Sequence, residues 1–262
     1  MPESNELKRI RETLMAHGLS KADAPADPMY LFDAWMAYAE ELEFHNANAM
    51  TLGTVSEESE PSLRNVLLRG YADGGFVFYT NYESRKGRDL AQKETAAALL
   101  GWLELERQIR LTGTVEKMTP ESSDQYFSRR DRASQISAVV SNQSYPVRDR
   151  RELEDKWKQL DSELEGESPE RPVNWGGYIL VPDTVEFWQG RPHRLHDRLL
   201  YTRIGETWSL ERLAPYGLKL AMKTAPIGGR SRQPLNQCFM MRDPSRAFET
   251  SPHRALPANA WR

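Results

Sequence analysis

The sequence predicts a mainly antiparallel β structure with peripheral helices, of the α+β class, over residues 27–215. Short strand-like runs follow one another from residue 48 to residue 118, separated by the turn-forming or charged stretches EESEP, ADGG and ELER. Strands joined this tightly pair antiparallel, because a parallel neighbour needs a crossover of a dozen or more residues. The chain has 262 residues, of which 39% are hydrophobic, so it can bury a sizeable core. We therefore expect a barrel or a sandwich.

The first element inside this region is a helix that begins at Pro28. Asp27 can serve as its N-cap, and proline suits the first helical position. Apolar residues then recur at helical spacing, which predicts a face directed towards the core. This apolar stripe consists of Leu31, Phe32, Trp35, Met36, Ala39 and Leu42. The polar residues 1–26 before it are expected to form a flexible N-terminal arm, with a short helix from Glu6 to Met15.

The later elements are bounded by turn residues and capping residues. A helix over residues 84–93 interrupts the strands, and a helical block covers residues 119–165. No internal repeat is visible. The expected strands are residues 48–56, 62–71, 75–81, 96–105, 107–118, 175–190, 193–204 and 207–213.

Residues 216–262 differ in composition from the rest of the chain. They carry Pro, Gly, Ser and Arg without helical or alternating periodicity, so we expect a disordered C-terminal extension. Their net charge of +6 leaves -9 on the first 215 residues. A body with this charge lacks the basic field of a general nucleic-acid-binding protein.

Several functional classes have no support in the sequence. The single cysteine, Cys238, excludes an internal disulfide and a zinc site built on thiolates, and no metal site is expected. No run reaches the roughly 18 apolar residues of a membrane helix, and the acidic N-terminus is unlike a signal peptide. We expect a cytoplasmic protein that has no membrane partner. The motifs of Rossmann dinucleotide-binding proteins, P-loop NTPases, zinc proteases and serine hydrolases are missing.

The stretch FWQGRPHRLHDR, residues 187–198, concentrates histidines and arginines. If residues 193–200 form a strand, its two-residue period places Arg194, His196 and Arg198 on one face. A solvent-facing edge strand with cross-strand ion pairs would also explain these charges. The hypothesis that they converge on an anionic ligand is favoured by further cationic clusters in the chain.

One such cluster lies at a helix N-terminus in the stretch YTNYESRKGRDL. Ser84 can act as the N-cap, and Arg85 and Lys86 place two positive charges in the first turn, where the helix dipole disfavours cations. This placement indicates a bound anion, with a solvated first turn as the alternative. Arg64 and Arg69 add charges at the two ends of an apolar strand, where a solvated edge is again the alternative.

The stretch YFSRRDRAS indicates a second phosphate site. Tyr126, Arg130 and Ser134 share one helical face if the helix continues that far, and their side chains can all donate hydrogen bonds to a phosphate. Polar residues that could meet the edge of a ring occur elsewhere. They are Gln108, Gln143 and Ser144. Together these signals point to two phosphorylated, ring-bearing ligands side by side.

Several stretches resemble those of the pyridoxamine 5'-phosphate oxidase family, in the family's order. They are NYESRKGRDL, LERQIRLTGTVEK, YFSRRDRASQISAVVSNQS, NWGGY, EFWQGRPHRLHDR and ERLAP, and the resemblance covers about residues 27–215. It implies a homodimeric, FMN-binding split β-barrel with FMN at the subunit interface. It also implies an oxidase that converts pyridoxamine or pyridoxine 5'-phosphate to pyridoxal 5'-phosphate, with O2 as electron acceptor and H2O2 as product.

The resemblance also assigns site residues by motif. The pyridine ring would contact the catalytic candidates Arg194 and His196, and His196 could assist proton removal. The substrate phosphate would be bound by Tyr126, Arg130 and Ser134, and Arg69 would also contact the substrate. The FMN contacts would be Arg64, Asn65, Val66, Leu67, Leu68, Arg69, Tyr79, Thr80, Arg85, Lys86, Gln108, Gln143, Ser144, Trp188 and Arg198.

Three features depart from the family pattern. Arg69 stands where the family usually has lysine, so a compact ammonium is exchanged for a planar guanidinium. Leu14 stands where some members have a tyrosine in an N-terminal segment that covers the substrate. The chain also continues past Pro215, where the family ordinarily ends. Two other functions stay open at this point. One is a sibling flavin oxidase that acts on another ring, such as a phenazine precursor, and the other is a non-catalytic module that binds FMN or pyridoxal phosphate. The phosphate set around Arg130 argues against the sibling oxidase, because a substrate without phosphate would not need it.

Overall fold

The computed structural model describes residues 5–72 and 74–215 of the chain. The helices are α1 (Asn5–His17), α2 (Pro28–Glu41), α3 (Arg85–Gln92), α4 (Pro120–Ser128), α5 (Arg132–Val140) and α6 (Arg150–Glu163), with short 3-10 turns η1 (Leu103–Leu105) and η2 (Pro192–Arg194). The strands are β1 (Ala49–Val55), β2 (Pro61–Leu67), β3 (Gly70–Ala72), β4 (Gly75–Asn81), β5 (Thr95–Trp102), β6 (Arg107–Lys117), β7 (Trp175–Gln189), β8 (Asp197–Ile204) and β9 (Thr207–Arg212). Residues 216–262, expected to be disordered, lie outside the described residues.

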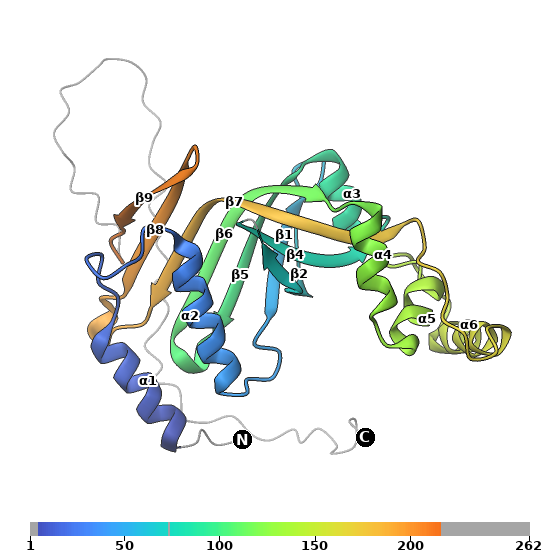
Figure 1. The fold of residues 1–262 in the computed structure, drawn as a ribbon, viewed down its shortest axis with the longest axis horizontal. Helices are drawn as coiled ribbons and strands as arrows, with labels where there is room; N and C mark the ends of the chain where they lie inside the picture. Colours follow the sequence, from blue (N-terminus) through green and yellow to red (C-terminus); the bar gives the residue numbers. More distant parts are fainter. Residues whose placement is uncertain (1–4, 73, 216–262) are drawn as a thin grey trace, which may run out of the picture. The chain divides into compact units, whose positions relative to one another are not determined.

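The described strands form one antiparallel sheet, as predicted. Its order is β2-β1-β5-β6-β7-β4-β3, and β8 and β9 continue it from β7. The long strand β7 pairs with β6 on one edge; on the other edge its first half pairs with β4 and its second half with β8. Figure 1 shows β7 running from the helices α4 to α6 towards the β8–β9 hairpin. The sheet therefore divides into two parts that share β6 and β7.

Helix α2 covers one face of the sheet and supplies part of the core. It begins as predicted, because the Asp27 carboxylate accepts a hydrogen bond of 2.8 Å from the backbone N–H of Met29. Phe32 and Trp35 of its apolar stripe make edge contacts with Phe76 and Phe187, at ring distances of 4.9 and 5.3 Å. Burial of each such side chain contributes roughly 1.5–3 kcal/mol to the free energy of folding.

The N-terminal residues, expected to be a flexible arm, contain helix α1 from Asn5 on. Its apolar side chains Leu7, Ile10 and Leu14 pack against the core. Figure 1 shows α1 beside the β8–β9 end of the sheet. No helix in the described part of the chain combines the length and the apolar character needed to cross a membrane.

Three predicted strands differ from the structure. The strand expected at 62–71 is interrupted at Leu68 and Arg69, because Leu68 turns into the core and bonds to Asn48 through both its N–H and its C=O. The strand expected at 96–105 ends at Trp102 in the turn η1. The strand expected at 193–204 begins only at Asp197, because Pro192 starts the turn η2.

Candidate functional site

A polar cavity of about 270 Å³ lies where strand β4, helix α5 and the start of β7 meet. It brings together five residues that the sequence nominated from separate stretches. They are Tyr79, Thr80, Arg130, Ser134 and Gln143, and Asn81, Ser137, Ala138, Ser141 and Trp175 complete the lining. Residues predicted from different parts of the chain therefore line one cavity, and Lys86 of the helix N-terminal cluster bonds to two of them, Thr80 and Gln143.

Lys86 adjoins this cavity through two of its lining residues, Thr80 and Gln143. Ser84 caps helix α3 as predicted and directs Lys86 inward, where its side chain is only 8% exposed. The ammonium donates hydrogen bonds to Gln143 Oε1, Thr80 Oγ1 and Ser84 Oγ at 2.9, 3.0 and 3.3 Å. Burial, together with the nearby charge of Arg64, lowers the pKa of Lys86 to about 8. Its acceptors are all neutral, so within residues 5–72 and 74–215 no carboxylate is paired with the charged ammonium.

Arg64 extends this cationic cluster from strand β2. Its guanidinium donates to Thr54 Oγ1 and to Ser62 Oγ, both at 2.6 Å, and lies 3.9 Å from the Asp89 carboxylate. Desolvation lowers the pKa of Arg64, and only Asp89 opposes that shift. Arg64 is thus a mostly buried cation rather than a solvated edge residue. Arg85, by contrast, is half exposed and lies 3.7 Å from Glu60.

The phosphate candidates on the other side of the cavity do not share one helix, which corrects the expected helical face. Helix α4 ends at Ser128, and Asp131 caps a new helix by accepting a hydrogen bond from the Ser134 N–H. Arg130 lies in the connection and donates to the Ser134 carbonyl oxygen at 3.2 Å. Tyr126 stacks on Tyr79 with a ring distance of 3.6 Å. Arg130 and Ser134 nevertheless both line the cavity, and Tyr126 lies beside it through its contact with Tyr79.

The guanidinium of Arg130 is only partly satisfied. It lies over the Trp175 ring at 4.7 Å, and its buried Nε has no hydrogen-bond partner among the described residues. Burial is the main cause that lowers the pKa of Arg130, and the charge of Arg69 lowers it further. Arg69 itself lines a separate cavity, of about 280 Å³, with Glu40, Asn48 and Tyr71. Arg69 therefore acts on Arg130 through charge and does not share its cavity.

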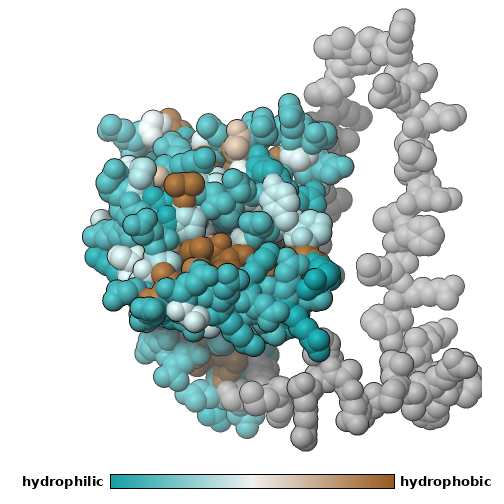
Figure 2. All heavy atoms as spheres, turned by 90° about the vertical axis from the view of Figure 1, so that its right-hand side faces the viewer, coloured by the Kyte–Doolittle hydropathy of each residue, from teal (hydrophilic) through white to brown (hydrophobic). Residues whose placement is uncertain are grey.

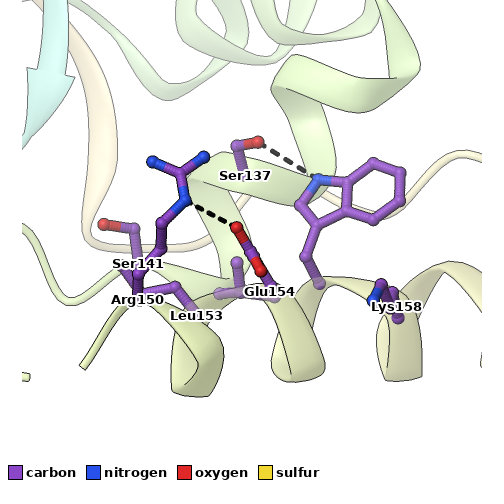
Figure 3. Close-up of a pocket in the computed structure, with 8 residues that line it drawn as sticks. Ser137, Ser141, Arg150, Leu153, Glu154 and Lys158 are labelled. Carbon is purple, nitrogen blue, oxygen red and sulfur yellow. Dashed lines mark hydrogen bonds and ion pairs between the residues drawn. The ribbon is translucent and has the colours of Figure 1, made fainter. Parts of the chain in front are cut away.

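Helix α6 supports the wall of the site from outside. Trp157 Nε1 donates to Ser137 Oγ at 3.2 Å and to the Ala133 carbonyl oxygen at 3.3 Å. Figure 3 shows this contact beside the Arg150–Glu154 ion pair, in a groove of about 480 Å³ between α5 and α6. Ser137 and Ser141 line both this groove and the polar cavity. The position of α5, and with it that of Ser134, thus depends on α6.

The remaining nominated residues of this part lie on β2, directly after it or in the loop after α5. Asn65 accepts a hydrogen bond from Thr51 Oγ1 at 2.7 Å, and Val66 and Leu67 are half-buried. Leu68 is in the core, so its side chain is not available to a cofactor. Ser144 is exposed and has a positive φ of 73°.

The other nominated residues gather at the far end of β7. Arg198 on β8 is opposite Trp188 and forms a bidentate ion pair with Glu186, with Nε–Oε1 and Nη2–Oε2 distances of 2.7 and 3.0 Å. The Trp188 ring lies 4.7 Å from the His196 ring. Gln108 on β6 pairs with Trp188 across the strands. These residues form a second cluster, with a planar guanidinium held by a buried carboxylate.

Arg194 and His196 precede strand β8, so the expected alternation on one strand face is wrong. His193 and Arg194 both have positive φ values, 60° and 59°, and belong to the turn η2. His196 nevertheless lies against Trp188 through the tilted ring contact. The grouping that the sequence suggested is thus produced by a turn and not by the period of a strand.

The two clusters lie at opposite ends of β7. Trp175, beside Arg130, pairs with the end of β4, whereas Trp188, beside His196, pairs with β8. Thirteen strand residues span on the order of 40 Å along the strand. Within one chain the cavity around Lys86 and Arg130 is therefore separate from the cluster around His196 and Arg198, as the ribbon of β7 in Figure 1 shows.

Sequence reasoning missed the residues that hold the nominated ones. Asp89 and Thr54 pair with Arg64, Trp175 covers Arg130, and Glu186 holds Arg198. Glu186 precedes Trp188 by two residues and therefore shares its strand face, which is a signal that could have identified it. The others come from distant parts of the chain, where no local pattern connects them.

Lys86 should make the stability of the anion-free protein depend on pH. Its pKa is lowered from 10.5 to about 8 in the folded state, so the unfolded chain binds more protons between these values and stability rises as pH increases. We expect the difference in unfolding free energy between wild type and Lys86→Met to change by up to about 3 kcal/mol across this range. Urea titrations from pH 8 to 10.5 measure it, and a difference that does not vary with pH would contradict the assigned burial.

Two family models match the chain. One, described as pyridoxamine 5'-phosphate oxidase, matches residues 37–162; the other, described as the C-terminal dimerisation region of pyridoxine 5'-phosphate oxidase, matches residues 175–215. The pyridoxine/pyridoxamine 5'-phosphate oxidase of Burkholderia lata is 52% identical over 212 residues, which cover 80% of this chain and 99% of that protein. The corresponding protein of Burkholderia thailandensis is 49% identical over the same coverage.

Solved structures show the same fold. PhzG from Burkholderia lata 383, in complex with tetrahydrophenazine-1-carboxylic acid, has a TM-score of 0.71 and 31% identity over 75% of this chain and 98% of PhzG. An FMN-binding protein from Nostoc punctiforme related to pyridoxamine 5'-phosphate oxidase has a TM-score of 0.58 and 19% identity over 73% of this chain and 99% of its own. The predicted fold class, an antiparallel split β-barrel with peripheral helices, is confirmed.

Proposed function

The chain belongs to the pyridoxamine 5'-phosphate oxidase family, and on that basis we propose that it oxidises pyridoxamine or pyridoxine 5'-phosphate to pyridoxal 5'-phosphate with O2 as electron acceptor. The observation that carries this proposal is the polar cavity, which two separate cationic groups adjoin: Arg130 lines it, and Lys86 bonds to Thr80 and Gln143 of its lining. One is Lys86 with its neutral acceptors, and the other is Arg130 with an unpartnered Nε. Two phosphates, one on the cofactor and one on the substrate, would satisfy both.

FMN is the cofactor, and the residues present fit it. Lys86 and Arg64 are desolvated cations opposed by one carboxylate, that of Asp89, so a phosphate monoester would complete the charge balance. Gln143 and Thr80 would lie beside this phosphate, because Gln143 accepts a hydrogen bond from the Lys86 ammonium and another from the Thr80 hydroxyl. FMN, when bound, would accept the hydride that leaves the 4' carbon of the substrate, the proton of the substrate's hydroxyl or amino group would pass to solvent, and O2 would take up two electrons and two protons to give H2O2. With pyridoxamine 5'-phosphate, water would then release the nitrogen as ammonia.

The protein's own contribution is to bind and orient the substrate. Arg130 and Ser134, with Tyr126 stacked nearby, would bind its phosphate through charge-assisted hydrogen bonds. Arg194 and His196 would bind the polar substituents of its pyridine ring. Holding the reacting atoms in place in this way supplies much of the acceleration that such a reaction needs.

These roles require two copies of the chain. Because the phosphate-binding cavity and the His196 cluster lie at opposite ends of β7, the second cluster must come from a partner protomer. Residues 175–215, which match a dimerisation region, carry that cluster. Apolar side chains around Gln143, namely Val139, Tyr145 and Val147, are 37–51% exposed and could be covered by the partner. Figure 2, which faces the α4–α6 side, shows an apolar area within a mostly hydrophilic surface.

Replacing Arg130 by alanine should chiefly weaken substrate binding. A hydrogen bond to a charged group contributes about 1.5–3 kcal/mol, so we expect KM for pyridoxamine 5'-phosphate to rise about 10- to 100-fold with little change in kcat. Steady-state kinetics measure both constants. Pyridoxamine without phosphate is the matched control, since its KM should not respond to the substitution; a fall in kcat alone would refute the assigned role.

A second candidate is suggested by the similarity to PhzG, whose structure contains a phenazine precursor. Assays of the purified, flavin-loaded protein distinguish the two. Formation of pyridoxal 5'-phosphate and peroxide from pyridoxamine 5'-phosphate supports the proposed function. Oxidation of a dihydro- or tetrahydrophenazine carboxylate alone would support the PhzG-like function, and bound flavin with neither product would indicate a binding module.

A further inference from the structure

The imidazole of His196 is held in one tautomer by the backbone. The N–H of Arg191 donates a hydrogen bond to His196 Nδ1 at 3.2 Å. Nδ1 can accept this bond only if it carries no proton, so the proton of the neutral ring is on Nε2. The Trp188 ring, 4.7 Å away and tilted by 39°, fixes the plane of the imidazole from the side.

Arg191 is in turn held by the carboxylate of Asp197. Asp197 Oδ2 lies 3.5 Å from Arg191 Nε and accepts a hydrogen bond of 2.9 Å from the N–H of Leu19, while Oδ1 pairs with Arg212 of β9. Arg191 Nη1 also donates to the carbonyl oxygen of Ala16 at 2.8 Å. The carboxylate thus ties together the end of α1, the turn after β7 and strand β9.

The end of α1 approaches this carboxylate so closely that only glycine fits there. Gly18 has a φ of +67°, and a Cβ on it would lie 2.2 Å from Arg191 Nη1 and 2.3 Å from Asp197 Oδ2. Any larger residue must therefore displace either the arginine or the carboxylate. A larger residue at position 18 would displace the Arg191 side chain. Because the backbone N–H of Arg191 bonds to His196, this displacement would in turn shift the imidazole.

We propose that Asp197 is a positioning residue that, through Arg191 and with the help of Gly18, holds His196 in the Nε2–H tautomer, so that His196 donates a hydrogen bond to the substrate and does not act as its base. This rests on the proposed function for the identity of the substrate. It differs from the expectation that His196 assists proton removal, since the ring nitrogen that lacks a proton is already occupied by the Arg191 N–H. The acceptor on the substrate would be a polar substituent of its ring.

The first test reads the tautomer directly. Long-range 15N–1H NMR spectra of 15N-histidine-labelled, FMN-loaded protein report which ring nitrogen carries the proton, and His196→Gln assigns the signal among the five histidines. We expect the Nε2–H pattern in wild type and a mixture of tautomers in Asp197→Asn. An Nδ1–H pattern in wild type, or an unchanged pattern in Asp197→Asn, would overturn the proposal.

The second test uses glycines remote from the substrate. Gly18→Ala should shift the tautomer signal and lower kcat on the order of 10-fold, since a small misplacement of a binding group can cost up to 100-fold. Gly205→Ala is the matched control: Gly205 has a similar φ of +59°, but a Cβ there would meet nothing within 4 Å. It should leave the tautomer signal and kcat unchanged. Equal effects of both substitutions on kcat and signal would show that only backbone strain is being measured, which would overturn the proposal.

The two readouts separate this inference from the proposed function. The NMR pattern requires no turnover, so a wild-type protein that has the Nε2–H tautomer but produces no pyridoxal 5'-phosphate would refute the function and leave the positioning role intact. A protein that produces pyridoxal 5'-phosphate with His196 in the Nδ1–H form would refute the positioning role and support the proposed function. FMN affinity, measured by flavin fluorescence, should be the same in wild type and Gly18→Ala, because Gly18 and the residues it contacts, Arg191 and Asp197, are not among those assigned to FMN.

Discussion

Replacing Arg194 by methionine is expected to lower kcat for pyridoxamine 5'-phosphate oxidation by about 100-fold while FMN stays bound. Methionine retains much of the length of the side chain but removes the guanidinium that would bind the substrate ring. Arg194 lies at the end of turn η2, away from the Lys86 cluster that we assign to the FMN phosphate. Turnover is measured by pyridoxal 5'-phosphate production at saturating substrate, and cofactor content by flavin absorbance.

The control for this substitution is Arg151→Met, which changes an exposed arginine on helix α6. It removes the same charge and should leave both kcat and flavin content at the wild-type level. Unchanged turnover in Arg194→Met would refute its assigned role. Loss of flavin together with turnover would mean that the residue serves the cofactor instead of the substrate.

Two variants that are each impaired should restore activity when their chains form mixed dimers. If each site takes Arg130 from one protomer and Arg194 from the other, a dimer of Arg130→Ala and Arg194→Met chains has one intact site and one doubly altered site. Random pairing makes half of the dimers mixed, so we expect about a quarter of wild-type activity by this symmetry argument. Co-expression of differently tagged chains, with assays at low substrate concentration, measures it.

The matched control pairs two substitutions from the same cluster. Under the proposed arrangement, each site takes both Arg130 and Lys86 from the same protomer. A mixed dimer of Arg130→Ala and Lys86→Met chains therefore has one altered residue in each of its two sites, and no site is fully intact. If Arg130→Ala and Arg194→Met together give only the average of the two separate activities, the site is contained in one chain and the shared arrangement is wrong.

Local signals in the sequence predicted the elements well wherever the deciding residues are neighbours. Asp27 and Ser84 cap their helices as expected, and β4 covers the expected residues 75–81. The errors have two causes: a partner far away in the chain, or a local capping residue or proline that the expected period overlooked. Leu68 leaves its strand because Asn48 and the core bind it, and Tyr126, Arg130 and Ser134 span two helices because Asp131 starts a new one.

The same division holds for the candidate site. The sequence by itself determined which residue types could bind phosphates and rings, since cations, hydroxyls and amides at these positions are visible in it. Only the tertiary structure decided which of them are buried, which are paired and which share a cavity, because desolvation and charge balance depend on neighbours far away in the chain. The sequence alone does not distinguish Lys86 from a surface lysine, but burial in the fold lowers its pKa to about 8. In the same way, His196 could carry its proton on either ring nitrogen, and only the contact of the Arg191 N–H with Nδ1 places it on Nε2.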